Sequence, residues 1–365
     1  MRRLLYIIIY IPLLLLTACD VHEWPDLPEN VQVHLKLNYE TMMTEWHHKY
    51  ENSKATEIAL GDTYDNLQSD GYIRYVIRAY PVTRKNRAIT RGFTHEFVYI
   101  KDLSEGYDCE FLLDLLPGEY YIKVWSDLLE TEDQMPFYDV DDFANILLQG
   151  THKGSSDIRD AFRGIKEVTL VADYAEKAPQ EVNITMQRPL AKFELIATDL
   201  KDFLEKEIEY LTKMASTRGE EPPTRVNTDN YVVKFYQPDM VYGYNMDSDV
   251  PNDTYPGTVI FESKLNILNE DEASLGFDYI FVNGTARNAY VNIVLCDDEG
   301  REIAKSEQIA IPVKRSRHTK LTGAFLTLKS SGGIKIESDF NGNHNYIYGD
   351  EEVEYEKTET EDEKK

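Results

Sequence analysis

The residue types that support catalysis or metal binding occur in this sequence without the spacing that such sites need. His47 and His48 lie side by side next to Trp46 and could bind a metal, but adjacent residues of a strand point to opposite faces. No third ligand accompanies them at a useful spacing. The sequence also contains no G-x-S-x-G, H-E-x-x-H, C-x-x-C, P-loop or G-x-G-x-x-G motif. We therefore predict a protein that is not an enzyme, with no catalytic residues, no metal ligands and no cofactor.

An acidic loop is the one stretch that imitates a cation site. Asp247 and Asp249 open the segment like a calcium loop, but the twelfth position is Thr258, where an EF-hand needs a bidentate glutamate. An EF-hand is excluded, and a solvated turn is the preferred interpretation over an irregular cation loop. Because 65 residues are acidic, a hydrolase with an unrecognised pair of carboxylates stays open as a third functional class.

A single cysteine near the start has a clearer chemical context. Arg2 and Arg3 precede an apolar run of signal-peptide length, which ends in Leu16-Thr17-Ala18-Cys19. This arrangement resembles the bacterial lipobox, in which the cysteine thiol is acylated and becomes the first residue after cleavage. The pattern predicts a lipoprotein signal peptide over residues 1–18, a lipidated Cys19 and a tether over 19–30. An uncleaved helix with an incidental cysteine is disfavoured, because the run is short and contains Pro12.

The charge and composition exclude other classes. The chain has 39 basic and 65 acidic residues, a net charge of −26, which excludes nucleic acid as a partner. With 42% hydrophobic residues and 25 tyrosines, the composition is that of a folded, strand-rich protein.

Most of the chain alternates between apolar and polar residues, as strands with one buried face do. VQVHLKLNY from Val31 and GYIRYVIRAYP from Gly71 are examples, and similar runs continue to the end of the second half. The turn LLPGEY at residues 115–120 is typical of transthyretin-like and immunoglobulin-like sandwiches. We predict two β-sandwich domains, at 31–188 and 189–330, with one helix over Asp199–Met214 and short helical turns within 128–163.

Two further segments have a functional interpretation. Arg84, Arg87 and Arg91 form a basic loop between strands that an arginine-specific protease could cut, although a loop paired with nearby acids is the preferred alternative. The segment 331–365 combines a short alternating stretch with an acidic tail. Its apolar residues Ile334, Ile336 and Phe340 could form the last strand of their own domain, or a strand lent to a neighbouring subunit.

Several blocks together resemble a known family. The lipobox, GYIRYVIRAYP, LPGEYYIKVWSD, MQRPLAKFELIATD and IPVKRSRHTKLTGAFLT are similar, in this order, to the FimB/Mfa-type fimbrillin-family lipoproteins, which are accessory or anchor subunits of type V pili. The resemblance covers roughly Cys19 to Tyr346. It implies an all-β fold of two tandem transthyretin-like (immunoglobulin-like) β-sandwich domains.

The resemblance also implies a location and a mode of assembly. The protein would be anchored by lipid to the outer membrane, exposed at the cell surface, and assembled with pilin-like subunits by β-strand addition. Anchor-type members keep their first strand, here VQVHLKLNY, and the segment after Gly332 would be the donor. The alternative is a cell-surface adhesin of the same fold that binds a host or glycan ligand, for which Trp125 is a candidate stacking platform.

Overall fold

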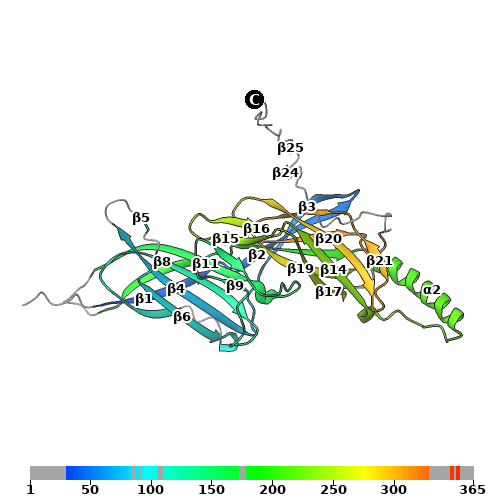
Figure 1. Cartoon of the computed structure of the whole chain (residues 1–365), viewed down its shortest axis with the longest axis horizontal. Helices are drawn as coiled ribbons and strands as arrows, with labels where there is room; N and C mark the ends of the chain where they lie inside the picture. The colour runs from blue at the N-terminus through cyan, green and yellow to red at the C-terminus, as the bar shows by residue number, and fades with distance from the viewer. Residues whose placement is uncertain are drawn as a thin grey trace, which may run out of the picture.

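The computed structural model describes residues 30–83, 88–89, 92–105, 110–171, 178–328, 346–348 and 351–353. These residues form strands almost throughout, and α2 (Leu200–Arg218) is the one α-helix among them. Figure 1 shows an elongated molecule in which two groups of strands follow one another along the long axis, with β1 in one group and α2 projecting from the far end of the other. The predicted all-β class is confirmed.

The first sandwich consists of two facing sheets. The smaller sheet has the order β12-β1-β7, and the larger has the order β11-β8-β4-β5 with β6 also paired to β4. The strands are β1 (Val31–Tyr39), β4 (Tyr72–Thr83), β5 (Ala88–Ile89), β6 (His95–Asp102), β7 (Glu110–Leu115), β8 (Gly118–Leu129), β11 (Ala161–Leu170) and β12 (Gln180–Met186). Their alternating inward side chains, such as Leu35, Ile73, Ile122 and Ile184, form one continuous core.

The second sandwich is built in the same way around its own core, which includes Phe193, Phe235 and Ile293. One sheet has the order β18-β19-β13-β23-β2-β3, and the other has the order β17-β14-β20-β21 with β22 paired to β20. The strands are β2 (Met42–Glu51), β3 (Lys54–Asp65), β13 (Leu190–Ala197), β14 (Tyr231–Pro238), β17 (Thr258–Lys264), β18 (Asn266–Ile267), β19 (Ala273–Phe281), β20 (Arg287–Asp297), β21 (Glu302–Lys305), β22 (Ile309–Val313) and β23 (Arg317–Gly323).

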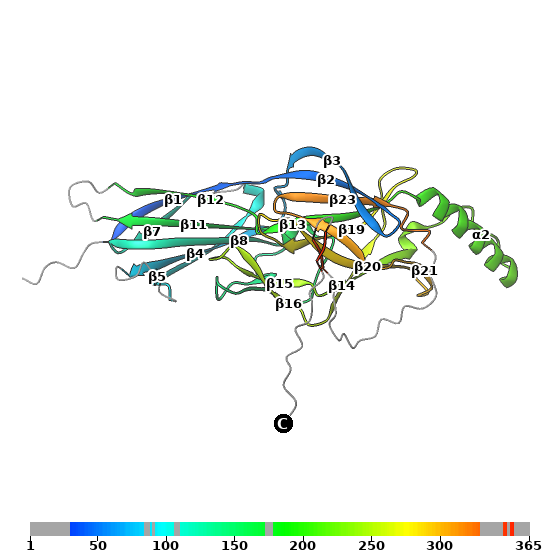
Figure 2. The same ribbon diagram turned by 90° about the horizontal axis from the view of Figure 1, so that it is seen from above.

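A hairpin from the first part of the sequence belongs to the second sandwich. β2 pairs in parallel with β23, and β3 follows β2 at the edge of the same six-stranded sheet. Residues 42–65 fall within the predicted first domain, but β2 hydrogen-bonds to β23, which lies far later in the chain, and β3 hydrogen-bonds to β2. Figure 2 shows β2 and β3 beside β23, while β1 lies among the strands of the other group.

A small third sheet joins the two sandwiches, in the order β16-β15-β10-β9. Its strands are β9 (Tyr138–Asp139), β10 (Ile146–Leu148), β15 (Val241–Asn245) and β16 (Val250–Thr254). β10 pairs with β15, so each half of the sequence supplies part of this sheet. A separate hydrophobic cluster lies here, and it includes Trp125, Tyr138, Tyr244 and Phe281. The junction is therefore a packed core, and the two sandwiches form one body.

Three local expectations need correction or refinement. The turn after Leu115 connects β7 to β8, which belong to the two facing sheets, and Gly118 within it has a positive φ of 158°. The stretch 128–163 contains β9, β10 and a single 3₁₀ turn (Asp157–Arg159) in place of several helical turns. The predicted helix is present as α2, but the carboxylate of Asp199 accepts hydrogen bonds from the amides of Leu326 and Thr327 and does not cap the helix.

Three short elements complete the structure. They are the 3₁₀ turns Leu103–Glu105 and Thr228–Asn230, and a hairpin of β24 (Tyr346–Tyr348) and β25 (Glu351–Val353).

Candidate assembly interface

The first strand lies in the centre of its sheet. β1 pairs in parallel with β12 over seven register positions and antiparallel with β7 over six. The side chains of Val33, Leu35 and Leu37 point into the core and are 0%, 0% and 4% exposed. Removing this strand would leave a groove with an apolar floor between two strands that both lack a partner on that side. In the structure described here, the chain's own first strand fills that groove.

The outward face of β1 is polar and paired. Nε2 of His34 lies 3.0 Å from a carboxylate oxygen of Glu110 on β7, and Nζ of Lys36 donates to Glu181 on β12 at 2.9 Å. The hydrogen bond to Glu181 raises the pKa of Lys36. These exposed pairs contribute little to stability, but they favour the observed register, because a shift of one residue would turn the apolar side chains outward.

The link from β1 to β2 is held inside the junction by one buried arginine. Arg188 is 0% exposed, and its Nε donates to Asp160 at 2.7 Å. Its Nη1 donates to the carbonyls of Glu40 and Thr41, which form the link itself. Burial raises the pKa of Asp160, an effect that the neighbouring Arg188 opposes. The N-terminal segment is thus fixed in the first sandwich by β1, at the junction by Arg188 and in the second sandwich by β2.

A second buried ion pair connects the halves. Nη1 of Arg159 donates to Asp278 on β19 at 2.6 Å, and both side chains are at most 2% exposed. Burial alone would raise the pKa of Asp278, but the charges of Arg159 and His152 and the hydrogen bonds from His152 and Gln237 lower it below its usual value. Breaking a buried pair of this kind leaves an uncompensated charge, so these contacts oppose separation of the sandwiches.

A third set of contacts involves Lys192, in the block that follows Arg188. Its Nζ donates to Asp157 at 2.6 Å and lies 4.0 Å from the ring centroid of Phe277. Sequence reasoning did not identify Arg188 or Lys192 as structural residues. The sequence contains one indication of this role. Both basic residues lie within or next to a predicted strand whose other side chains mark a buried face.

The acidic loop is part of the junction, and its carboxylates are ion-paired where a solvated turn was the preferred interpretation. Asp247 forms a salt bridge with Lys123 of β8. Asp249 forms salt bridges with Arg315 and with Arg163 of β11, and Nη2 of Arg163 lies 2.7 Å from Oδ1 of Asp249. Asp249 also accepts a hydrogen bond from Tyr244. Burial acts to raise the pKa of Asp249, but the hydrogen bonds and the two guanidinium charges lower it. Both carboxylates are therefore engaged in holding the halves together.

The structure also gives the positions of His47, His48 and Trp125, which were candidates for metal or ligand binding. His47 contacts Glu45 at 3.0 Å, whereas His48 is buried, as expected for neighbours on opposite faces. Within the described ranges no group of three or more His, Cys, Asp or Glu residues could hold a metal ion. Trp125 cannot serve as a stacking platform in this structure, because it is 0% exposed and packs edge-on against Tyr138.

The predicted site residues lie outside the described residues. These are Cys19, the apolar residues Ile334, Ile336 and Phe340, and the basic residues Arg84, Arg87 and Arg91. Among the residues that the structure does describe, no helix has the length and apolar character needed to cross a membrane.

Comparison with known proteins places the chain in a family. Among the solved structures that the chain matches, the fimbrial anchor protein Mfa2 from Porphyromonas gingivalis is 10% identical, with a TM-score of 0.35, and the alignment covers 76% of this chain and 83% of that one. A fimbrial assembly protein from Parabacteroides distasonis is 9% identical, with a TM-score of 0.37 and coverage of 83% and 93%.

No curated protein matches the sequence. A family model described as a family of unknown function (DUF6562) matches residues 28–362, which is nearly the whole chain. The chain therefore belongs to the DUF6562 family.

Proposed function

We propose that this protein is a non-enzymatic lipoprotein of the outer membrane that serves as the accessory or anchor subunit of a type V-like pilus. Cys19 would carry the lipid, and residues 19–30 would connect it to β1. Association with pilin-like subunits would use β-strand addition, in which a donated strand completes the sheet of a neighbour.

The central position of β1 is the observation that carries this proposal. A subunit that accepts a donated strand needs an open groove, and here that groove is filled by residues 31–39 on both hydrogen-bonding sides. Such a subunit can give a strand but has no vacant place for one between β12 and β7. That property suits the end of a polymer, where growth stops at the membrane.

The route of the chain through the molecule supports a mechanical role. The lipid would be attached twelve residues before β1, so any pull on the pilus is transmitted to the membrane through the N-terminal segment. β1, the buried Arg188 and β2 hold that segment in both sandwiches and at their junction. A force on the N-terminal segment would therefore be resisted by contacts in both sandwiches and at their junction.

The donor role belongs to the segment after Gly332. Ile334 and Ile336 alternate with Lys335, so a strand formed here would present two isoleucines to a groove and the lysine to solvent. The arrangement provides a matched pair of substitutions. Ile334→Asp with Ile336→Asp removes the apolar face, whereas Lys335→Asp changes the charge on the opposite face only.

The test is capture of the partner from native membranes, with the full lipidated chain as bait. Wild-type protein and the Lys335→Asp variant are expected to recover a polymeric, pilin-like partner, and the double isoleucine variant to recover none. Deleting residues 354–365 controls for the acidic end and should leave capture intact. Recovery of the bait alone by the wild-type chain would refute the pilus role.

A further inference from the structure

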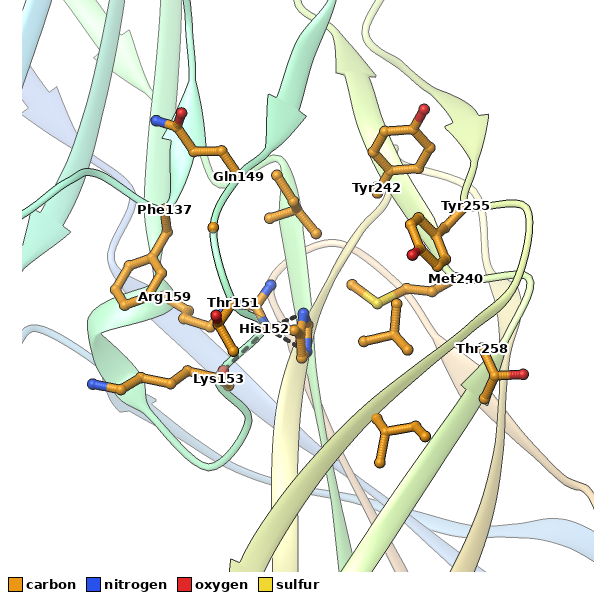
Figure 3. A pocket seen from close by; sticks show the side chains of 14 residues that line it. Phe137, Gln149, Thr151, His152, Lys153, Arg159, Met240, Tyr242, Tyr255 and Thr258 are labelled. Atoms are coloured by element: carbon orange, nitrogen blue, oxygen red, sulfur yellow. Dashed lines mark hydrogen bonds between the residues drawn. The ribbon is translucent and has the colours of Figure 1, made fainter.

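A pocket of about 340 Å³ opens beside the junction of the two sandwiches. One wall is the chain that leaves β10, over residues 148–153, and the other is formed by β15, β17 and the connection that follows β16. Figure 3 shows the two walls facing each other, with Gln149, Thr151 and Lys153 on one side and Tyr242 and Tyr255 on the other. The two walls differ in chemistry, and that difference restricts the ligand.

The second wall is a solvent-exposed surface of aromatic and apolar side chains. Tyr242 and Tyr255 pack edge-to-face, with ring centroids 6.0 Å apart and planes at 89°. Tyr255 is 44% exposed and Ile260, next to it on the wall, is 52% exposed. An exposed aromatic ring held in place by a second ring offers a flat face on which the C–H face of a sugar ring can pack.

The first wall is polar and basic. Although the chain has 65 acidic residues, no Asp or Glu lines this pocket. The lining includes His152, Lys153 and Arg159, together with the amide of Gln149 and the hydroxyl of Thr151. Nζ of Lys153 is paired with Glu130 at 2.6 Å, so Arg159 is the cation of this wall that retains an unpaired donor. Donors of this kind suit a ligand that carries several hydroxyl groups and a negative charge.

Arg159 is the fixed element of this wall. Its Nη1 donates to Asp278 at 2.6 Å and lies 2.7 Å from Nε2 of His152, which holds the imidazole in place. Its Nη2 is buried and has no hydrogen-bond partner among the described residues. An unsatisfied donor on a guanidinium is costly inside a protein. A bound acceptor, direct or through a water molecule, would satisfy it.

We propose that this pocket binds a carboxylate-bearing sugar unit of a glycan, such as a uronic or sialic acid residue. The ring packs on Tyr255 and Tyr242, Gln149 and Thr151 bind its hydroxyl groups, and its carboxylate accepts a hydrogen bond from Nη2 of Arg159. The proposal does not depend on the anchoring role, since no residue of β1 lines the pocket.

The assay is isothermal titration of the full chain in detergent with two acidic probes, a galacturonic acid trisaccharide and N-acetylneuraminic acid. A neutral galactose trisaccharide is the matched control ligand. Binding of at least one acidic probe is expected, because its carboxylate satisfies the buried donor of Arg159. The neutral trisaccharide is expected to bind at least tenfold more weakly.

Two variants test whether the pocket is the site. Tyr255→Ala should lower the affinity by up to about tenfold, from the loss of one aromatic contact. Arg159→Lys keeps a cation beside Asp278 but removes the second guanidinium donor, and should lower the affinity for the acidic probe. Tyr210→Ala on α2 and Arg188→Lys beside Asp160 make the same changes outside the pocket, and should bind like the wild type. The proposal is overturned if neither acidic probe binds at millimolar concentration, if the neutral sugar binds equally well, or if both pocket variants bind normally.

Discussion

Replacing Leu35 by alanine tests whether β1 is a permanent central strand. The side chain is 0% exposed, and its backbone neighbours are Val182 on β12 and Phe111 on β7, which are themselves buried. Truncating a buried leucine removes its transfer free energy and leaves a cavity, which together cost about 2–5 kcal/mol. Because β1 is held on both sides, the sheet has little freedom to close the cavity. We expect a loss of about 3 kcal/mol or more.

A matched control is available on the adjacent strand. Leu112 on β7 is 64% exposed, so Leu112→Ala removes the same atoms from a surface position and should change the free energy of unfolding by less than about 0.5 kcal/mol. The two variants lie on neighbouring strands of one sheet and alter its opposite faces.

Urea unfolding followed by tryptophan fluorescence measures both effects, in a background that carries Trp24→Phe and retains either Trp46 or Trp125 as the single reporter. Trp46 lies on β2 in the second sandwich and Trp125 in the junction, so their signals report regions away from the substitution. The packed junction predicts one cooperative transition, and Leu35→Ala should move its midpoint for both tryptophans. If Leu35→Ala is no more destabilising than Leu112→Ala, β1 is not packed as described. If the midpoint at Trp46 is unchanged, the sandwiches are not coupled.

Two other predictions concern the buried charges. Arg188→Ala should destabilise the fold by about 3–5 kcal/mol in urea unfolding, because Asp160 is left buried without its partner. The double replacement Arg188→Met and Asp160→Leu should cost clearly less, because no buried charge remains unpaired. An equal loss of stability in the two variants would contradict this explanation. Burial lowers the pKa of His318, so the unfolded chain takes up a proton more readily than the folded chain. The free energy of unfolding should therefore fall as the pH drops below about 6.5, and it should fall less in His318→Asn when urea midpoints are compared across this range. An identical dependence of the midpoint on pH in both proteins would rule out His318 as the cause.

Local structure was largely predictable from the sequence. Alternation in VQVHLKLNY and GYIRYVIRAYP gives β1 and β4, and the helical spacing after Asp199 gives α2. These patterns record which side chains are buried, and burial is a local property of each residue that its hydrophobicity reports directly.

The roles of individual polar and aromatic residues were harder to predict. Asp247 and Asp249 look like ligands of a cation when considered with their neighbours in sequence, but their partners are Lys123, Arg163 and Arg315, which come from distant strands. Trp125 follows a predicted hairpin, and only the packing of the junction sheet against β8 shows that its ring is covered. Contacts between residues far apart in the chain decide these roles.

The sequence by itself determined the β class and the alternating faces of the strands, because each depends on neighbouring residues. The prediction of lipid attachment at Cys19 also rests on the sequence alone. The tertiary structure decided which strands pair. It places β1 between β12 and β7, sends β2 to β23 in the other sandwich, and brings Tyr242 and Tyr255 opposite Lys153. Backbone hydrogen bonds are the same for every residue type, so alternation specifies the buried face of a strand without specifying its partner. That choice is made only when the whole core packs.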